Sequence, residues 1–289
     1  MYLYCVNNLT EFELKKNSTI TKVGYSFLAL GILLLLLHKY PDNWCFSLFI
    51  KEIYANLSCE LISIAVTILL INYLYEKREE SSNKRRLIRE LGSEDKGFTS
   101  RALKEIKELG YLADGTLNGA DLSSANLEGL DFSGAVLKNV NFSMARLNNS
   151  IFREVILEGV ILNGAEARQC IFERSVFSNV TLKSSNLYSA IFIGAQISNV
   201  DFLSAKLEQA EFIDAKIENS KFEDSVVRLA NFVRAEISGT NFSMADFNGM
   251  NVRNAKFVRC DMHNVIGWEN MIDASSAEFL ACNKIPKQS

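Results

Sequence analysis

The chain has 289 residues and a formal net charge of −3. So small a charge gives no indication of a polyanionic partner, and it argues against a strongly acidic protein that imitates nucleic acid. The six cysteines form no Cys-x-x-Cys pair, so neither a disulfide framework nor a cysteine-based metal site is expected.

Residues 19–38 are predicted to form a first transmembrane helix, after an N-terminal segment of residues 1–18. The stretch from Val23 to Leu37 carries no charge. With its flanks it approaches the ~20 residues needed to cross a hydrocarbon core. No small-residue cleavage motif follows it, so a removable signal peptide is not favoured.

A second apolar stretch, residues 57–75, is predicted to return across the membrane. The connecting residues 39–56 are expected to form an external loop with an interfacial helix, because they carry the aromatic residues Trp44, Phe46, Phe49 and Tyr54. The two apolar stretches together indicate a transmembrane hairpin. The alternative is a hairpin buried in the core of a soluble domain.

Basic residues predict the orientation of this hairpin. Three lysines lie at or before its start and six basic residues follow it, whereas the loop contains only Lys39 and Lys51. The positive-inside rule therefore places both chain termini in the cytoplasm.

Polar residues recur at helical spacing along the second apolar stretch. They define a polar stripe of Asn56, Glu60, Ser63 and Thr67. Polar side chains inside a membrane seldom face lipid. We expect the stripe to pack against the first helix or a neighbouring subunit, and a water-filled pore is the alternative.

Residues 76–110 are predicted to form a helical linker and an N-terminal cap. A helix from Glu76 to Leu91 would continue out of the membrane, and Gly92 begins a break. A second helix, Thr99 to Leu109, would end at Gly110. One face of this second helix is expected to cover the open end of the next domain, and it consists of Ala102, Leu103, Ile106 and Leu109.

Residues 111–266 repeat every five residues. An apolar residue stands at each fifth position from Leu112 to Met262, with Ala167 as the weakest member, and a small residue usually precedes it by two positions. Neither a helix of period 3.6 nor a strand of period 2 produces this spacing. Each unit is therefore one side of a coil, and stacked coils form a solenoid.

Units such as Ala120-Asp121-Leu122 resemble the A-(D/N)-L-x-x unit of the pentapeptide-repeat family. The resemblance implies a right-handed quadrilateral β-helix with four units per coil and the Leu or Phe pointing inward. A coil period of 20 residues then predicts aromatic columns, one of them Phe132, Phe152, Phe172, Phe192, Phe212 and Phe232. The preceding stretches Leu87 to Ser93 and Ala102 to Leu112 resemble the lead-in of a membrane-anchored bacterial subgroup, which implies a bacterial inner-membrane location.

Residues 267–289 are expected to form a C-terminal cap and tail. The five-residue register fails at Gly267, and Trp268 would lie over the last coil. Asp273 would cap a short helix from Ala274 to Cys282. The alternative is that this cap also forms a dimer contact.

The sequence offers no catalytic, metal or cofactor site. His38 and His263 have no local carboxylates at a metal-binding spacing, and no nucleophile-elbow or phosphate-loop motif is present. We therefore expect a protein that is not an enzyme and has no cofactor.

Some members of the family bind DNA gyrase by resembling DNA, and this is a remote alternative here. Residues 111–266 contain 18 acidic and 14 basic residues. One outward column mixes the two signs, unlike a row of phosphates; it reads Glu128, Asn148, Arg168, Tyr188, Glu208, Arg228 and Asn248.

Outward-facing aliphatic residues give the best indication of function. They gather on two adjoining sides of the coil and are expected to form one stripe, made of Val136, Ile151, Ile156, Ile171, Val176, Ile191, Ile193, Ile213 and Val233. β-branched residues also favour strands for their own sake, but an exposed apolar patch usually marks a partner surface.

Together these features indicate a β-helix preceded by a two-helix transmembrane hairpin and a short helical cap. We expect a membrane-anchored, non-enzymatic scaffold whose cytoplasmic β-helix binds a protein partner or a second copy. The alternative is an oligomeric membrane effector whose hairpin forms or gates a pore, for example in stress or anti-phage defence.

Overall fold

The computed structural model describes the backbone of residues 19–37 and 47–283 and the side chains of residues 20–34 and 56–283. The expectations for residues 1–18 and for the first part of the loop, up to position 46, lie outside this range. The chain divides into two compact units, Met1–Asn83 and Lys84–Ser289.

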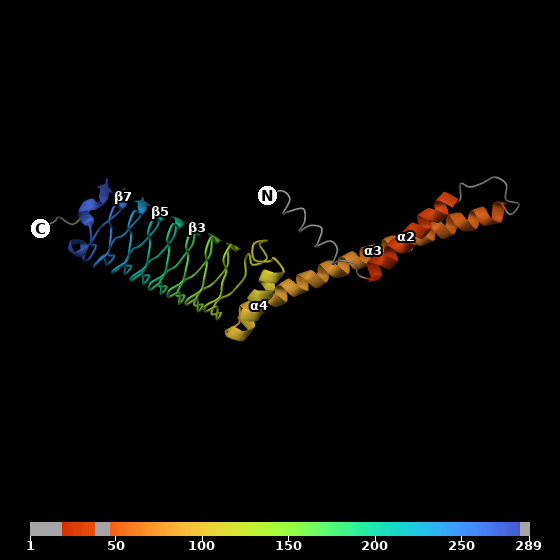
Figure 1. The fold of residues 1–289 in the computed structure, drawn as a ribbon, viewed down its shortest axis with the longest axis horizontal. Coiled ribbons are helices and arrows are strands. Elements are labelled where there is room, and N and C mark those ends of the chain that lie inside the picture. Colours follow the sequence, from red (N-terminus) through yellow and green to blue (C-terminus); the bar gives the residue numbers. More distant parts are fainter. Residues whose placement is uncertain (1–18, 38–46, 284–289) are drawn as a thin grey trace. The chain divides into compact units, whose positions relative to one another are not determined.

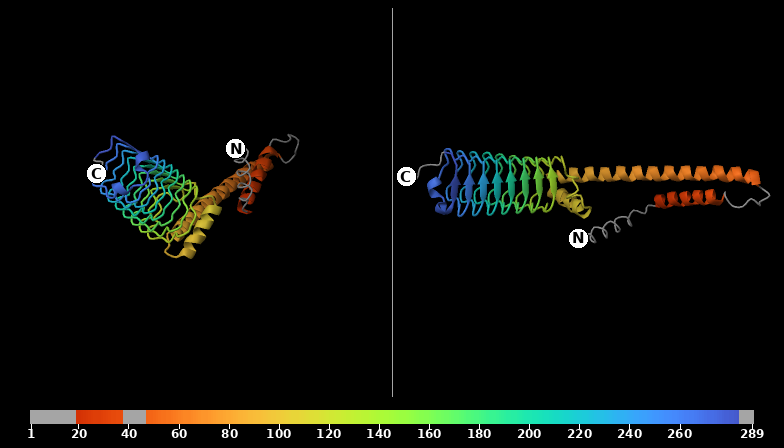
Figure 2. Two further views of the ribbon diagram at one scale, coloured as in Figure 1. Left: turned by 60° about the vertical axis from the view of Figure 1, so that its left-hand side comes forward. Right: turned by 90° about the horizontal axis from the view of Figure 1, so that it is seen from above.

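In the first unit, helix α2 (Thr19–Leu37) lies beside helix α3 (Ser47–Leu91) (Figures 1 and 2). Near the start of α2, the hydroxyl of Thr21 accepts a 3.0 Å hydrogen bond from the amide of Asn72. Ten residues later, Gly31 lies against Ile62. Later residues of α2 therefore contact earlier residues of α3, so the two helices form an antiparallel hairpin.

Helix α3 is one continuous element of 45 residues. Residues 47–56, where an interfacial helix was expected within the loop, are helical, but they form the start of α3 and not a separate helix, because α3 does not break between Ser47 and Leu91. It contains neither glycine nor proline, the two residues that most readily interrupt a helix. The last turns of α3 belong to the second unit.

Helix α4 (Lys96–Glu108) follows after a short break. It begins three residues earlier than predicted because Asp95 caps it: the carboxylate accepts hydrogen bonds from the backbone amides of Gly97 at 2.7 Å and Phe98 at 3.2 Å. The helix ends before Gly110, whose φ of 73° is the left-handed conformation that terminates many helices.

The buried face of α4 lies on the first coil of the solenoid. Ala102 and Ile106 are fully buried in the same core as the coil, and Thr99 Oγ1 donates a 2.6 Å hydrogen bond to the backbone carbonyl of Asn126. Leu109 is 37% exposed. Its predicted place on this face is wrong, because it lies beyond the last turn of the helix.

The rest of the second unit is a parallel β-solenoid of about seven turns. Each turn adds one short strand to a parallel sheet, seen as the stacked arrows in Figure 2. From β1 to β7, successive strands are offset by 20 residues, and isolated bridges such as Ile151 to Ile171 repeat that offset on the other sides. The strands are β1 (Val136–Lys138), β2 (Ile156–Glu158), β3 (Val176–Ser178), β4 (Gln196–Ser198), β5 (Lys216–Glu218), β6 (Glu236–Ser238), β7 (Lys256–Val258) and β8 (Glu278–Leu280).

Aromatic columns fill the solenoid, as the period of the sequence predicts. Phe192 stacks on Phe172 and Phe212 with ring centroids 5.1 and 4.7 Å apart. It meets Phe202 of the neighbouring column edge-on at 6.2 Å. Stacked and edge-on arrangements are the favourable geometries of aromatic pairs, so the predicted inward columns are confirmed.

The predicted C-terminal helix is wrong. Trp268–Asn270 (η1) and Ala274–Ser276 (η2) are short 3₁₀ turns, and Glu278–Leu280 forms strand β8, which pairs with β7. Asp273 makes no capping hydrogen bond with its side chain. Trp268 is 7% exposed and its ring lies 4.9 Å from that of Phe279, so it does cover the end of the core.

The coil continues past Gly267 because it accommodates two additional residues. The offset between paired residues is 20 at Asp246 and Ile266, 21 at Asn251 and Ile272, and 22 at Lys256 and Glu278. One extra residue therefore enters with each of the two 3₁₀ turns. A strict five-residue count fails here although the solenoid does not.

Candidate docking surface and apolar helices

Three isoleucines form a ladder along one side of the solenoid. Ile151, Ile171 and Ile191 occupy the same position in successive coils and are joined by parallel bridges. All three are half-buried, because each leans on its neighbours above and below. We call them the isoleucine ladder, and they present a short flat strip of aliphatic surface.

Two further isoleucines lie next to the isoleucine ladder. Ile193 follows Ile191 by two residues, Ile213 occupies the same position one coil later, and both are half-buried. Val233, the next residue of that column, is only 5% exposed. It therefore has little surface to offer a partner, and its place among the contact residues is wrong.

The remaining predicted residues form a separate patch. Val136, Ile156 and Val176 belong to strands β1 to β3, on the next side of the coil, and Ile156 is 44% exposed. Between this patch and the ladder lies a charged corner made of Arg153, Glu154, Glu173 and Arg174.

Ion pairs hold this charged corner together. Arg153 Nε lies 3.1 Å from Glu173 Oε2, and Arg174 contacts both Glu173 at 3.1 Å and Glu154 at 3.8 Å. The expectation of a single apolar stripe is therefore wrong. The columns of the repeat predict the two apolar sides correctly. The charged residues at the bend between those sides separate them into two patches.

The structure exposes three large apolar residues that the sequence reasoning missed. Met144, Leu229 and Met244 are 66%, 58% and 51% exposed at the corners of coils, with φ values of 55–60°. Space for two of them comes from a glycine one coil later: a Cβ on Gly164 would lie 2.5 Å from Met144, and one on Gly249 would lie 2.7 Å from Leu229. They are scattered singly, which is ordinary for a protein surface.

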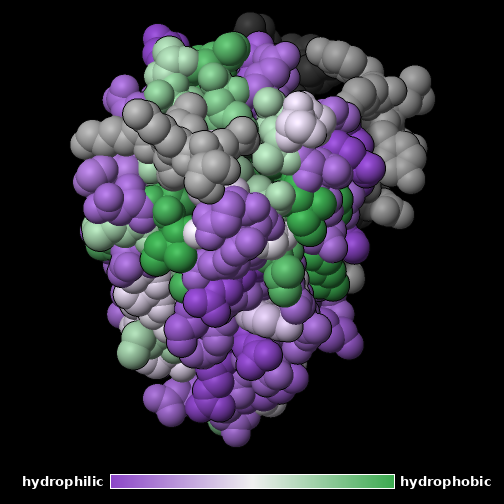
Figure 3. Space-filling view, turned by 90° about the vertical axis from the view of Figure 1, so that its left-hand side faces the viewer, coloured by the Kyte–Doolittle hydropathy of each residue, from purple (hydrophilic) through white to green (hydrophobic). Residues whose placement is uncertain are grey.

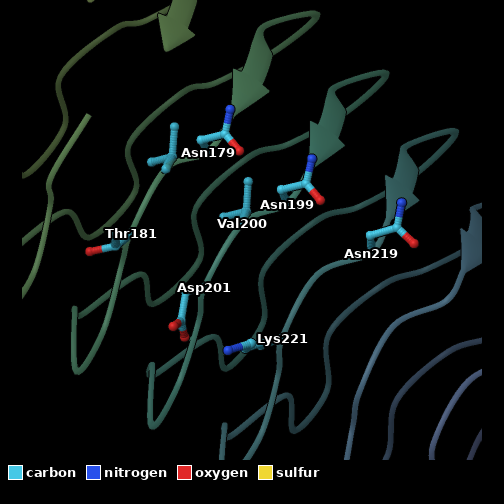
Figure 4. A pocket seen from close by; sticks show the side chains of 8 residues that line it. Asn179, Thr181, Asn199, Val200, Asp201, Asn219 and Lys221 are labelled. Carbon is cyan, nitrogen blue, oxygen red and sulfur yellow. The ribbon is translucent and has the colours of Figure 1, made fainter. Parts of the chain in front are cut away.

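A shallow groove of about 320 Å³ runs along another corner (Figure 4). Asn179, Asn199 and Asn219 repeat along it, one per coil, each with φ near 50–55°. Asn tolerates this left-handed conformation better than most residues. The left-handed backbone therefore accounts for the repeat of asparagines, and Asp201 in the groove is paired with Lys183 at 3.2 Å.

The C-terminal end of the solenoid carries its own apolar residues. Figure 3 views the molecule from this end and shows hydrophobic patches within a mainly hydrophilic surface. Ile266, Ile272 and Leu280 are each 46–56% exposed there. Strand β8 is the last strand of the described sheet.

In the first unit, small residues bring α2 and α3 close together. A Cβ on Gly24 would lie 2.7 Å from Leu69, and one on Gly31 would lie 2.8 Å from Ile62. Within the first unit, the buried side chains among the described residues of α3 are Ser58, Ala65 and Asn72, spaced by seven residues. Close approach at small residues is the usual way in which helices pack in membranes.

The polar stripe of α3 does not take part in this contact. Asn56, Glu60, Ser63 and Thr67 are all exposed, so the expectation that they pack against the first helix is wrong. Thr67 Oγ1 donates a 2.8 Å hydrogen bond to the backbone carbonyl of Ser63. Helical spacing identified the stripe, but the glycines of α2 and the small residues of α3 determine which face is covered.

Among the described residues, one helix is long and apolar enough to cross a membrane, and it is residues 56–91 of α3. Residues 20–34 of α2 form a shorter apolar helix. More than half of the large hydrophobic residues that the structure exposes belong to these two helices.

Charged residues on the solenoid pair with neighbouring side chains and do not form a row of one sign. In the mixed column, Arg168 lies over the ring of Tyr188 at 5.0 Å, and Arg228 Nε lies 2.5 Å from Asp246 of a neighbouring column. Burial raises the pKa of the Cys260 thiol to about 12, which removes its reactivity at neutral pH. Within the described part of the chain, no group of three or more His, Cys, Asp or Glu residues could hold a metal.

Solved structures with a similar fold include HetL, a pentapeptide repeat protein involved in heterocyst differentiation regulation in the cyanobacterium Nostoc. It is 19% identical with a TM-score of 0.30, and the match covers 61% of this chain and 93% of HetL. QnrB1, a plasmid-mediated fluoroquinolone resistance protein, is 18% identical with a TM-score of 0.41, covering 57% and 88% of the two chains. A pentapeptide repeat protein from the cyanobacterium Cyanothece is 12% identical with a TM-score of 0.20, covering 61% and 96%.

A search of curated proteins finds no match. Two family profiles match the solenoid: "Pentapeptide repeat region" covers residues 165–242, and "Pentapeptide repeats (8 copies)" covers residues 117–154 and 230–266. Both fall within the coils whose inward columns and 20-residue offset are described above. The repeats of the second unit therefore belong to the pentapeptide-repeat family.

Proposed function

We propose that this protein is a membrane-anchored docking rod. The α2–α3 hairpin holds it in a bacterial inner membrane as a two-pass anchor, with both termini in the cytoplasm. The solenoid then presents the isoleucine ladder to a protein partner and performs no chemistry of its own.

The exposed apolar surface of the hairpin carries this proposal. Leu70, Ile71 and Leu74 of α3 and Leu30 and Leu33 of α2 are each 46–61% exposed. Full burial of such a side chain contributes about 1.5–3 kcal/mol, so the exposed half of each is costly in water, whereas lipid removes that cost. The basic residues that flank the hairpin, and the few in its loop, favour the stated orientation.

Membrane fractionation tests the anchor. The full-length protein should remain with membranes after an alkaline carbonate wash, and a C-terminal reporter should be active only as a cytoplasmic fusion. Release of the protein by the wash would remove the basis of the proposal.

The isoleucine ladder favours a partner that is itself an apolar protein surface. The ladder is a flat aliphatic strip bordered by the charged corner, which is the usual pattern of an apolar contact with a polar rim. Its ion pairs are largely satisfied within the chain, so contacts at the rim would contribute mainly to specificity.

A triple substitution tests the docking surface. Changing Ile171, Ile191 and Ile193 to Ser should abolish the recovery of partners that are cross-linked to the protein in membranes. The matched control changes Ile161, Leu229 and Met244 to Ser, because these are exposed apolar residues away from the ladder. Equal loss in both variants, or retention of the partner in the ladder variant, would contradict this function; thermal unfolding of both variants checks that they are folded.

A further inference from the structure

The polar stripe of α3 lies on the side of that helix opposite to α2. At 100° per residue, its four residues lie about 180° from the buried positions Ser58, Ala65 and Asn72. The hairpin's own partner helix therefore cannot cover them. Among the described residues, the side chains of Asn56, Glu60 and Ser63 are exposed and have no hydrogen-bond partner.

The spacing of the stripe matches a helix–helix seam. Its residues follow one another at intervals of four, three and four, which is the alternation of the a and d positions of a heptad. Leu70 and Leu74 continue the same alternation and are 56% and 55% exposed. α3 thus carries two seams, one filled by α2 and one facing outward.

We propose that the outward seam of α3 binds the same seam of a second copy of this chain, so that two hairpins associate in parallel. This inference rests on the proposed membrane location. Copies that are inserted with the same orientation bring the same residues to the same depth, which makes the stripe self-complementary.

Hydrogen bonding is the reason for this pairing. The Glu60 carboxylate is an acceptor, and Asn56 and Ser63, about one turn before and after it, are donors. In a parallel pair, Glu60 of each copy lies at the same depth as Glu60 of the other copy, and the donors Asn56 and Ser63 of the other copy lie in the layers one turn before and one turn after it. Lipid provides no donor for the carboxylate, so polar residues of this kind face protein in membranes.

Disulfide cross-linking in membranes tests the seam. In the full-length chain with its other accessible cysteines changed to Ser, Ser63→Cys should give a covalent homodimer on mild oxidation. Val66→Cys is the matched control, because Val66 is 54% exposed on the same helix but lies off the seam. Cross-linking of the two variants to the same extent, or of Ser63→Cys to a different protein only, would overturn the proposal.

A second variant separates this inference from the proposed anchor. Changing Asn56, Glu60 and Ser63 to Leu removes the hydrogen bonds but makes the helix more apolar, so the protein should stay in the membrane. Dimer recovered from bilayers by a lysine-reactive cross-linker should fall by about tenfold or more, as expected for lost interhelical hydrogen bonds. An unchanged dimer would contradict the seam, whereas a protein found outside the membrane before any substitution would contradict the anchor instead.

Discussion

Ala167 is the one central position of the repeat without a large side chain, yet it is fully buried. Phe177 lies two units further along the same coil, on its opposite side, in a column that is otherwise mostly Leu and Ile. It is also fully buried and meets Phe172 edge-on, with ring centroids 5.4 Å apart. The larger ring compensates for the missing volume at Ala167, as close packing requires.

This compensation predicts a coupling between the two residues. Ala167→Leu alone should overpack the coil and cost about 1–3 kcal/mol, and Phe177→Leu alone should leave a cavity at a similar cost. The double variant should recover much of the loss, with a coupling energy on the order of 1 kcal/mol or more. Denaturant unfolding of the four proteins measures it, and simple additivity would show that the two sites do not share space.

At the scale of elements, both ends of the solenoid depend on how its coils are covered. At the N-terminal end, Lys107 Nζ of α4 lies 2.7 Å from Asp131 Oδ2 of the first coils. Burial acts to raise the pKa of Asp131, but hydrogen bonds from Lys107 and Ser133 outweigh it and lower the pKa to about 2. The folded chain therefore binds this proton more weakly than the unfolded chain.

The sign of that shift predicts a pH dependence. The contribution of the Lys107–Asp131 pair to stability is fully present above about pH 4 and is lost as the pH falls towards 2. Because both side chains are partly exposed, the contribution is about 0.2–1 kcal/mol. The unfolding free energies of wild type and Lys107→Gln should differ by this amount at pH 7 and converge below pH 3; a difference that stays constant with pH would exclude the pair as its cause.

At the C-terminal end, the continued coil brings two cysteines together. The backbone amide of Asn283 donates a 2.9 Å hydrogen bond to the carbonyl of Cys260, so Cys282 follows Cys260 one coil later. The two thiols contact equivalent carbonyls, those of Val258 and Leu280, each at 3.6 Å. Coils stacked about 4.8 Å apart fall within the Cα separations that a disulfide spans.

Oxidation therefore tests the register of the last coil. At alkaline pH, where thiolate can form, oxidised glutathione should accept two electrons from Cys260 and Cys282, forming one protein disulfide and two molecules of reduced glutathione. Peptide mapping of the native protein would detect this link, and Cys282→Ser would prevent it. Cys170 is the internal control, because its register neighbours are Ser150 and Ala190. A helix from 274 to 282, as the sequence alone suggested, would leave the two thiols unlinked.

For the molecule as a whole, the repeat was predictable because its period repeats some thirty times and each unit has one inward position. The predictions of the last coil, the apolar stripe and the covered helix face failed because one or two residues change the structure at each place. One extra residue in each of two turns hid the last coil from a five-residue count. The charged corner at Arg153 and Arg174 divided a stripe that was drawn from columns alone. In the hairpin, helical spacing predicts the polar stripe, but the covered face depends on Gly24 and Gly31, which are spaced by seven residues in the sequence.

Substitutions in the hairpin and in the solenoid have different expected effects in a docking rod and in a pore-forming effector. In a docking rod, the hairpin only anchors and associates, so Glu60→Gln, which keeps a hydrogen-bonding side chain, should leave both membrane potential and partner recovery unchanged. In a pore, the Glu60 carboxylate would line the ion path and set its field, so overproduction of the wild type should depolarise the membrane and Glu60→Gln should alter that depolarisation. In cells that overproduce wild type, Glu60→Gln or the Ile171, Ile191 and Ile193 triple-Ser variant, a potential-sensitive dye measures depolarisation and cross-linking in membranes measures partner recovery. We expect no depolarisation in any of them and loss of the partner in the triple variant alone; depolarisation that requires Glu60 would replace the docking function with the pore.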